Sequence, residues 1–162
     1  MGAVHILLVE DTLTQALMMQ HLLESEEFKV SVVKDGHKAL QFLSSQRPDL
    51  ILSDVSMPEI DGYQLCQQLK ADPSTRDIPF VLLSSFRDAL DIVKIVNSQA
   101  DSFLLKRFDK NYIVAALQDI LAGTNSKLSR ELSAQGDPVK LASMLTAAFR
   151  TTVYLLPMVT QD

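Results

Sequence analysis

Residues 51–62 read Ile-Leu-Ser-Asp-Val-Ser-Met-Pro-Glu-Ile-Asp-Gly, and this stretch decides how the rest of the chain is interpreted. An apolar run that begins at Leu50 ends in one acidic residue, Asp54, and then breaks into a turn at Pro58. Asp61-Gly62 marks a second turn and the start of a helix. In a parallel sheet, the carboxyl end of such a strand is where ligands bind, so Asp54 is a candidate functional residue.

Five strand-like segments alternate with amphipathic helical stretches over the first 122 residues. This alternation predicts βαβ units and therefore an α/β fold with a doubly wound parallel sheet, covered by helices on both faces. The first and fourth segments are continuously apolar, as central parallel strands are. The predicted strands are His5–Val9, Lys29–Val33, Leu50–Ser53, Phe80–Ser84 and Ser102–Leu105.

The overall composition is that of an ordinary globular protein, with 47% hydrophobic and 22% charged residues in 162. No apolar run approaches the roughly 20 residues that cross a bilayer, and no signal peptide is recognisable, so we expect no membrane contact. The single cysteine, Cys66, fits a cytoplasmic location. The net charge of −5 argues against direct nucleic-acid binding.

Acidic residues follow two of the predicted strands. Glu10 and Asp11 come directly after the first strand, and Asp54 follows the third. Neighbouring strand ends lie about 5 Å apart, so these carboxylates can meet. Because three negative charges in one pocket repel each other, the sequence predicts a compensating hard cation, above all Mg²⁺.

The fourth predicted strand ends with the hydroxyl of Ser84, and the ammonium of Lys106 directly follows the fifth. Taken singly, Asp54 is more often a cap or turn residue and Lys106 a surface lysine. Together with a divalent cation they make the set that phosphoryl transfer to an aspartate needs. The carboxylate of Asp54 is the nucleophile, and the cation, lysine and hydroxyl stabilise the charged phosphoryl oxygens.

Four segments resemble the receiver domain of two-component response regulators, the CheY-like domain, over residues 3–122. They are "LLVEDT" (7–12), "DLILSDVSMPEIDGYQL" (49–65), "IPFVLLSSF" (78–86) and "DSFLLKRFD" (101–109). The resemblance implies a flavodoxin-like, five-stranded parallel sheet in the order 2-1-3-4-5. It also implies a domain that catalyses only its own phosphotransfer and autodephosphorylation, and is not otherwise an enzyme.

The resemblance assigns roles to the acidic residues. Asp54 accepts a phosphoryl group from a histidine kinase or a phosphotransfer protein. Asp11 and Asp54 bind Mg²⁺, Glu10 helps through a coordinated water, and the backbone carbonyl of Ser56 completes the protein ligands.

The same resemblance implies a switch. Ser84 is the hydroxyl that moves towards the phosphoryl group, and Lys106 pairs with one of its oxygens. Phe103 stands at the aromatic switch position, which reports phosphorylation on the face formed by the fourth helix, the fifth strand and the fifth helix.

The sequence departs from the family pattern near the end of the predicted sheet. Lys106 is followed by Arg107, whereas the family has a proline with a cis bond there, so this bond is either a costly cis non-proline bond or trans. Gln99 replaces a glycine before the fifth strand, so the end of the fourth helix is expected to be shaped differently.

A third departure concerns the lifetime of the phosphorylated state. Phe86 stands two residues beyond Ser84, near where water would attack the aspartyl phosphate. We expect Phe86 and Ser56 together to set this lifetime, since a bulky apolar side chain excludes water and cannot position it.

Residues 123–162 form a predicted helical extension or linker, with amphipathic spacing over 137–152. The segment is too short for a winged-helix domain and has no basic patch. Three interpretations stay open: association with a downstream protein or a second copy, a fragment cut before an output domain, and a disordered tail.

Two other functions compete with the receiver. An aspartyl-nucleophile phosphatase commonly needs a second acid two residues after its nucleophile, and that position here is Ser56, which disfavours it. The other is a phosphorylation-independent interaction module, which the substitution at Arg107 leaves open.

Overall fold

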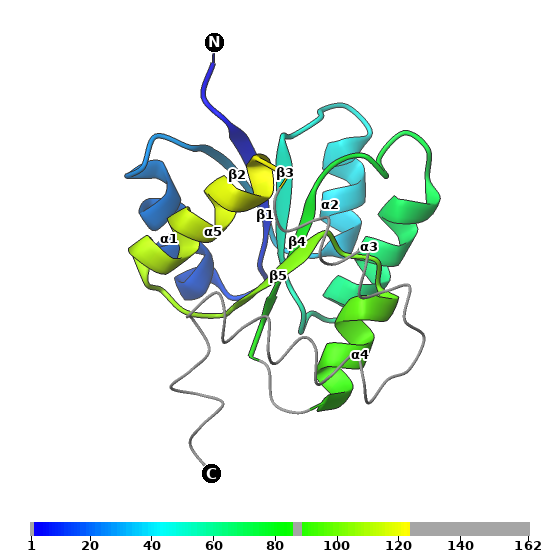
Figure 1. Cartoon of the computed structure of the whole chain (residues 1–162). Helices are drawn as coiled ribbons and strands as arrows, with labels where there is room; N and C mark the ends of the chain where they lie inside the picture. Colours follow the sequence, from blue (N-terminus) through cyan, green and yellow to red (C-terminus); the bar gives the residue numbers. More distant parts are fainter. Residues whose placement is uncertain (1, 86–88, 124–162) are drawn as a thin grey trace.

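The computed structural model describes residues 2–85 and 89–123. Five parallel strands form one sheet in the order β2-β1-β3-β4-β5, as predicted (Figure 1). Four strands have the predicted bounds, whereas the predicted end of the third at Ser53 was wrong by one residue, because Asp54 still pairs with Leu83. The strands are β1 (His5–Val9), β2 (Lys29–Val33), β3 (Leu50–Asp54), β4 (Phe80–Ser84) and β5 (Ser102–Leu105).

Within the described residues, five helices alternate with these strands and lie on both faces of the sheet (Figure 1). Their bounds are α1 (Leu13–Glu24), α2 (Gly36–Leu43), α3 (Gly62–Ala71), α4 (Ala89–Asn97) and α5 (Lys110–Leu121). Helices α1 and α5 pack on one face, and α2, α3 and α4 on the other, so that two separate hydrophobic clusters form.

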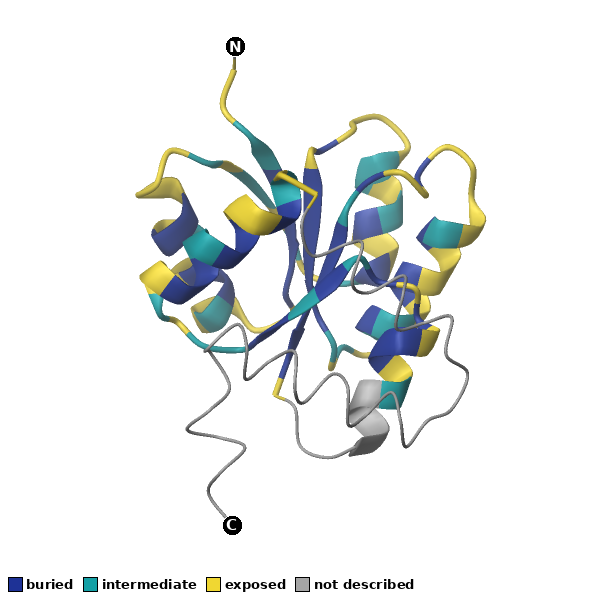
Figure 2. Cartoon of the chain, in the orientation of Figure 1, coloured by how far each residue is buried: buried dark blue, intermediate teal, exposed yellow. Residues whose placement is uncertain are grey.

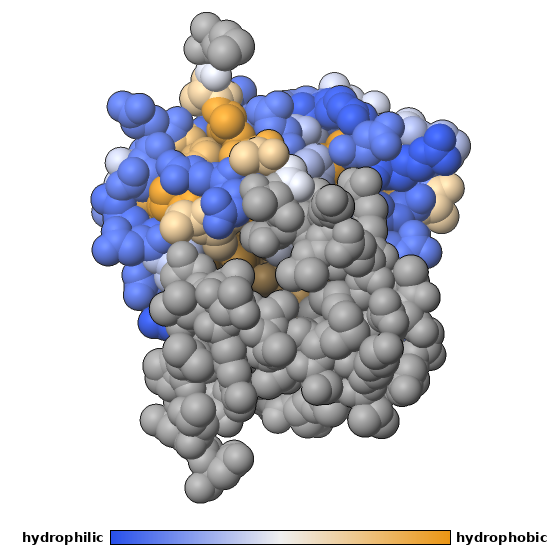
Figure 3. All heavy atoms as spheres, viewed as in Figure 1, coloured by the Kyte–Doolittle hydropathy of each residue, from blue (hydrophilic) through white to orange (hydrophobic). Residues whose placement is uncertain are grey.

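The three central strands are buried along almost their whole length, because helices cover both of their sides (Figure 2). This burial explains the continuous apolar runs in β1, β3 and β4. The helices are buried towards the sheet and exposed on the outside. On the visible described surface, hydrophilic residues dominate, and apolar ones gather mainly towards α1 and α5 (Figure 3).

Aspartates begin three of the helices. The side chains of Asp35, Asp61 and Asp109 accept hydrogen bonds from the first turns of α2, α3 and α5. At α3 the side chain of Gln64 also reaches back to the backbone of Asp61 and completes a capping box. The two Asp-Gly pairs in the sequence are therefore helix caps that fix where the loops after β2 and β3 end.

The turn after α4 keeps a left-handed backbone although it has no glycine. Gln99 adopts φ 65°, a conformation that glycine enters easily and that costs other residues about 1–2 kcal/mol. The sequence predicted a different shape at the end of α4. The described backbone instead keeps a left-handed residue there, at a higher cost in free energy than glycine would have.

The predicted extension over residues 123–162 lies, apart from Gly123, outside the described residues. Within the described part of the chain, no helix is both long and apolar enough to cross a membrane. Cys66 is buried in α3.

Candidate functional site

Three carboxylates meet where β1 and β3 end. Val9 pairs with Ser53, so Glu10 and Asp11 follow β1 directly beside Asp54. One carboxylate oxygen from each of the three acidic residues lies within 4.8 Å of the others. Glu10 and Asp54 are buried, at 4% and 5% exposure, while Asp11 is exposed to solvent. The predicted acidic cluster is therefore present and opens to solvent on the side of Asp11.

Lys106 joins this cluster from the end of β5. Its Nζ atom lies 2.8 Å from Oδ2 of Asp54 and 3.1 Å from Oε1 of Glu10. Burial alone would lower the pKa of the Lys106 ammonium, but hydrogen bonds and charge attraction from the two carboxylates outweigh burial and raise the pKa. Lys106 is therefore a fixed positive charge at Asp54.

One ammonium does not balance three carboxylates. Burial raises the pKa of Glu10 to about 7, and the neighbouring Asp54 adds to the shift, while Lys106 opposes it. Apart from the Lys106 ammonium, 3.1 Å from Oε1, no donor among the described residues reaches the buried carboxylate oxygens of Glu10. Oxygen ligands with surplus negative charge are what a hard divalent cation requires, so Glu10, Asp11 and Asp54 fit such an ion.

The bond between Lys106 and Arg107 is trans, because no cis peptide occurs in the described segments. The Lys106 amide donates to the carbonyl of Ser84 at 2.9 Å, and the Arg107 amide donates to the carbonyl of Leu105 at 2.8 Å. Of the two alternatives left open by the sequence, the trans bond is correct. Lys106 nevertheless reaches Asp54.

Gly62 contributes to the site in a way that its place in a turn signal did not reveal. A Cβ atom at this position would lie 2.3 Å from the backbone oxygen of Asp54 and 3.0 Å from Cα of Val55. Its amide donates to the carbonyl of Val55 at 2.8 Å and closes the loop after β3. Only glycine allows the first turn of α3 to pack this closely under Asp54.

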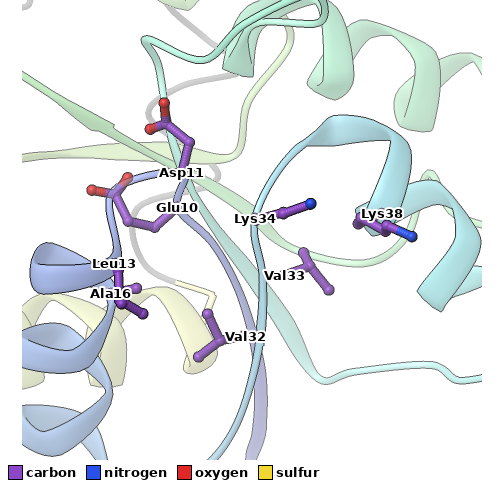
Figure 4. Close-up of a pocket in the computed structure, with 8 residues that line it drawn as sticks. All are labelled: Glu10, Asp11, Leu13, Ala16, Val32, Val33, Lys34 and Lys38. Atoms are coloured by element: carbon purple, nitrogen blue, oxygen red, sulfur yellow. The ribbon is translucent and has the colours of Figure 1, made fainter.

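Two open pockets flank the acidic cluster, and Asp11 lines both. The first has a volume of about 480 Å³, and its wall combines apolar residues of α1 and β2 with two lysines (Figure 4). Its lining residues are Glu10, Asp11, Leu13, Ala16, Val32, Val33, Lys34 and Lys38. The second, of about 530 Å³, is lined by Asp11, Val55, Ser56, Met57, Pro58, Asp61, Tyr63 and Lys94. Ser56 thus shares a pocket with Asp11, on the side where its carbonyl was predicted to act.

The predicted switch residues lie on β4, which pairs with the strand of Asp54, and on β5, the edge strand beyond β4. Ser84 is buried at the end of β4, one position beyond Leu83, the residue that pairs with Asp54. Phe103 is half-buried in β5 and packs against both hydrophobic clusters. Phe86 lies outside the described residues.

The fold and the site together define a class. A flavodoxin-like sheet of order 2-1-3-4-5 carries an aspartate, two acidic neighbours and a lysine at its carboxyl edge, which is the arrangement of a CheY-like domain. A family model of the response regulator receiver domain matches residues 6–118. The chain therefore belongs to the response regulator receiver family.

Curated relatives agree with this assignment. The chain is 36% identical to the response regulator PleD of Caulobacter vibrioides over 115 residues, which are 71% of this chain and 25% of PleD. It is 33% identical to the DNA-binding response regulator MtrA of Mycobacterium tuberculosis over 128 residues, 79% of this chain and 55% of MtrA. The chain thus spans a quarter to about half of the length of these relatives.

Solved structures show the same fold. The signal receiver domain of a signal transduction histidine kinase from Syntrophus aciditrophicus is 42% identical, with a TM-score of 0.71 over 75% of this chain and 92% of that one. The receiver domain of sensor histidine kinase PA1611 from Pseudomonas aeruginosa is 31% identical, with a TM-score of 0.63 over 74% and 95% of the two chains. That structure is described with a magnesium ion coordinated in its active-site cleft.

Proposed function

We propose that this domain is the phosphoacceptor of a two-component phosphorelay and that Asp54 is the phosphorylated residue. The observation that carries the proposal is the contact of 2.8 Å between the Lys106 ammonium and the Asp54 carboxylate inside an acidic cluster. An oxygen of Asp54 attacks the phosphorus of a phosphohistidine, the N–P bond breaks, and an aspartyl phosphate forms. Water later cleaves this acyl phosphate and releases inorganic phosphate.

Mg²⁺ is the proposed cofactor. Asp11, Asp54 and the carbonyl of Ser56 would hold it, and Glu10 would act through a coordinated water. The ion would neutralise charge on the transferred phosphoryl oxygens. The surplus of carboxylates over ammonium in the cluster and the magnesium described in the similar receiver of PA1611 support this assignment.

Ser84, Lys106 and Phe103 are proposed to carry the signal. Ser84 moves towards the phosphoryl group, Lys106 stays paired with one of its oxygens, and Phe103 changes its packing on the face formed by α4, β5 and α5. This change alters association with a downstream protein or a second copy, through that face and the C-terminal segment. Phe86 and Ser56 are proposed to set how long the phosphoryl group survives.

The phosphodonor is proposed to be a histidine kinase or a phosphotransfer protein that contacts α1. Leu13, Leu17 and Met18 are among the most exposed large apolar side chains of the described chain, at 74%, 55% and 47%. Leu13 also lines the pocket that contains Glu10 and Asp11 (Figure 4). An exposed apolar helix face beside the acceptor suits a helical partner that must bring its histidine to Asp54.

The relatives do not agree on an output. MtrA is described as DNA-binding, whereas the two solved receivers from Syntrophus aciditrophicus and Pseudomonas aeruginosa described above come from histidine kinases. The acidic chain, with a net charge of −5, disfavours direct nucleic-acid binding by this domain. We therefore propose protein–protein contact as the output of the described domain.

Titration with beryllofluoride and Mg²⁺ tests the proposal and separates the alternatives. Beryllofluoride stands in for the phosphoryl group, so one equivalent should bind in the presence of Mg²⁺, and Asp54→Asn should abolish binding. A phosphatase would release many equivalents of phosphate from a phosphate ester. A phosphorylation-independent interaction module would bind no beryllofluoride, and that result would overturn the proposal.

A further inference from the structure

The loop that carries Lys106 lacks the proline that the family uses there, yet its backbone is fixed. Proline would restrict φ and could not donate a hydrogen bond, whereas the Arg107 amide donates to Leu105 across Lys106. The Lys106 amide also donates a hydrogen bond to the carbonyl of Ser84, at the end of the neighbouring strand β4. Two hydrogen bonds therefore hold the backbone around Lys106, where the family uses the ring of a proline.

One side chain of α5 contacts the chain on both sides of Lys106. The Leu105 amide donates to the Tyr112 hydroxyl at 2.8 Å, and this hydrogen bond is buried. The Arg107 guanidinium lies over the ring of Tyr112, with its carbon 5.1 Å from the ring centroid. Tyr112 itself is only 3% exposed, so its ring is a fixed platform.

Asp109 closes the arrangement. One of its carboxylate oxygens lies 3.4 Å from Nη2 of Arg107, and the other accepts the Tyr112 amide at 3.3 Å. The cap of α5, the tyrosine and the arginine thus support each other. We call Arg107 and Tyr112, with Asp109 between them, the Arg107–Tyr112 clamp.

We propose that Arg107 and Tyr112 are positioning residues, which hold the Lys106 ammonium against Asp54 in place of the family's proline. The inference rests on the proposed roles of Asp54 and Lys106. A lysine side chain has four rotatable bonds, so a small shift of its backbone moves the ammonium away from the acceptor. Displacements of about 1 Å at a reacting centre cost up to about 100-fold in rate.

The test uses phosphorylation of the full chain by acetyl phosphate at saturating Mg²⁺. Tyr112→Phe removes the hydroxyl and keeps the ring, and Arg107→Ala removes the cation. We expect each variant to be phosphorylated about tenfold more slowly at saturating acetyl phosphate. Arg107→Lys, which keeps a cation over the ring, should restore most of the rate.

Thr75→Val is the matched control for stability. The Thr75 hydroxyl donates a buried hydrogen bond of 2.7 Å to the carbonyl of Leu69, after the end of α3 and away from the acidic cluster. This variant should lose stability as Tyr112→Phe does, yet keep the wild-type rate. If the control slows as much as the clamp variants, destabilisation explains the effect and the proposal is wrong.

A double-mutant cycle with Lys106→Ala tests whether the clamp affects the phosphorylation rate through Lys106. In that background, Tyr112→Phe and Arg107→Ala should change the rate by less than about twofold, because the group that they position is gone. Independent, multiplying effects would overturn the proposal, as would wild-type rates in both single variants.

Amide hydrogen exchange tests the Arg107–Tyr112 clamp independently of phosphorylation at Asp54. If the wild type is not phosphorylated, the proposed function fails, but the clamp still predicts faster exchange at Leu105 in Arg107→Ala. Unchanged exchange at Leu105 in that variant would show that Arg107 does not hold the loop.

Discussion

Two clusters of lysine and carboxylate lie at opposite ends of the sheet, and only one of them is balanced. At the amino end, Lys70 pairs with Asp101, Lys70 also donates to the carbonyls of Arg76 and Ile78, and Asp101 accepts the amide of Phe80. At the carboxyl end, Lys106 faces Asp54 and Glu10, with Asp11 beside them.

The difference shows how a structural ion pair is told from a functional one. Lys70 and Asp101 carry one charge of each sign and have backbone partners, so nothing further is needed there. The carboxyl-end cluster has three carboxylates for one ammonium, and Lys106 is the only donor within the described chain that reaches the Glu10 oxygens. A surplus of buried carboxylates is typical of a site that binds a cation.

The largest expected effect on stability is at the amino end. Lys70→Met leaves the Asp101 carboxylate largely buried without its cation, which costs about 3–5 kcal/mol. Urea unfolding measures this loss, while Lys110→Met, which breaks an exposed pair with Glu26, should cost at most about 1 kcal/mol. Equal losses in the two variants would contradict a structural role for the buried pair.

A smaller loss of stability, with a loss of function, is expected from Gly62→Ala. The new methyl group would overlap the backbone of Asp54, and relief of this clash should cost about 2–3 kcal/mol and weaken beryllofluoride binding. Gly36→Ala is the control, because Gly36 also begins a helix after an aspartate but faces mainly the Ile60 side chain. If both variants bind beryllofluoride like the wild type, Gly62 does not support the site.

The surplus of carboxylates at the carboxyl end of the sheet predicts that the free energy of unfolding depends on pH. Without Mg²⁺ the folded protein has a Glu10 pKa raised from 4.5 to about 7, so it binds more protons than the unfolded chain within this window. The free energy of unfolding should therefore fall as pH rises from about 4.5 to about 7, by up to about 1.4 kcal/mol per pH unit.

Unfolding by urea at several pH values measures this slope. Glu10→Gln removes the titrating group and should flatten the curve, and Mg²⁺ should restore stability at neutral pH in the wild type. The same slope in Glu10→Gln would show that another group is responsible.

The smallest effect is expected next to Asp101. Gln99→Gly relieves a left-handed residue that costs about 1–2 kcal/mol, but glycine gains about 0.5–1 kcal/mol of freedom in the unfolded chain. The net stabilisation should be about 0.5–1 kcal/mol, with beryllofluoride binding unchanged. Thermal unfolding tests it, and a destabilised variant would mean that the Gln99 side chain makes a contact worth more than the strain.

Much of the fold and of the site followed from the sequence because the strands are short and sharply ended. Apolar runs that stop at Glu10, Asp54, Ser84 and Lys106 place these residues at one edge once the sheet is parallel. The carboxylate cluster and the contact of Lys106 with Asp54 could be predicted for this reason.

Residues that act through packing could not be predicted in the same way. Gly62 looked like an ordinary helix start, because its contact with the Asp54 backbone exists only in three dimensions. Tyr112 belongs to no motif in the sequence, and its hydrogen bond to Leu105 depends on how α5 packs beside β5. The trans bond before Arg107, in contrast, is the ordinary state of a non-proline peptide bond, and only the cis proline of the family made the cis alternative worth weighing.

The most direct test of the central claim is intact-mass measurement after treatment with acetyl phosphate and Mg²⁺. We expect one added phosphoryl group on the wild type, located at Asp54 by fragmentation, and none on Asp54→Asn or without Mg²⁺. A phosphoryl group on another residue, or equal labelling of Asp54→Asn, would contradict it.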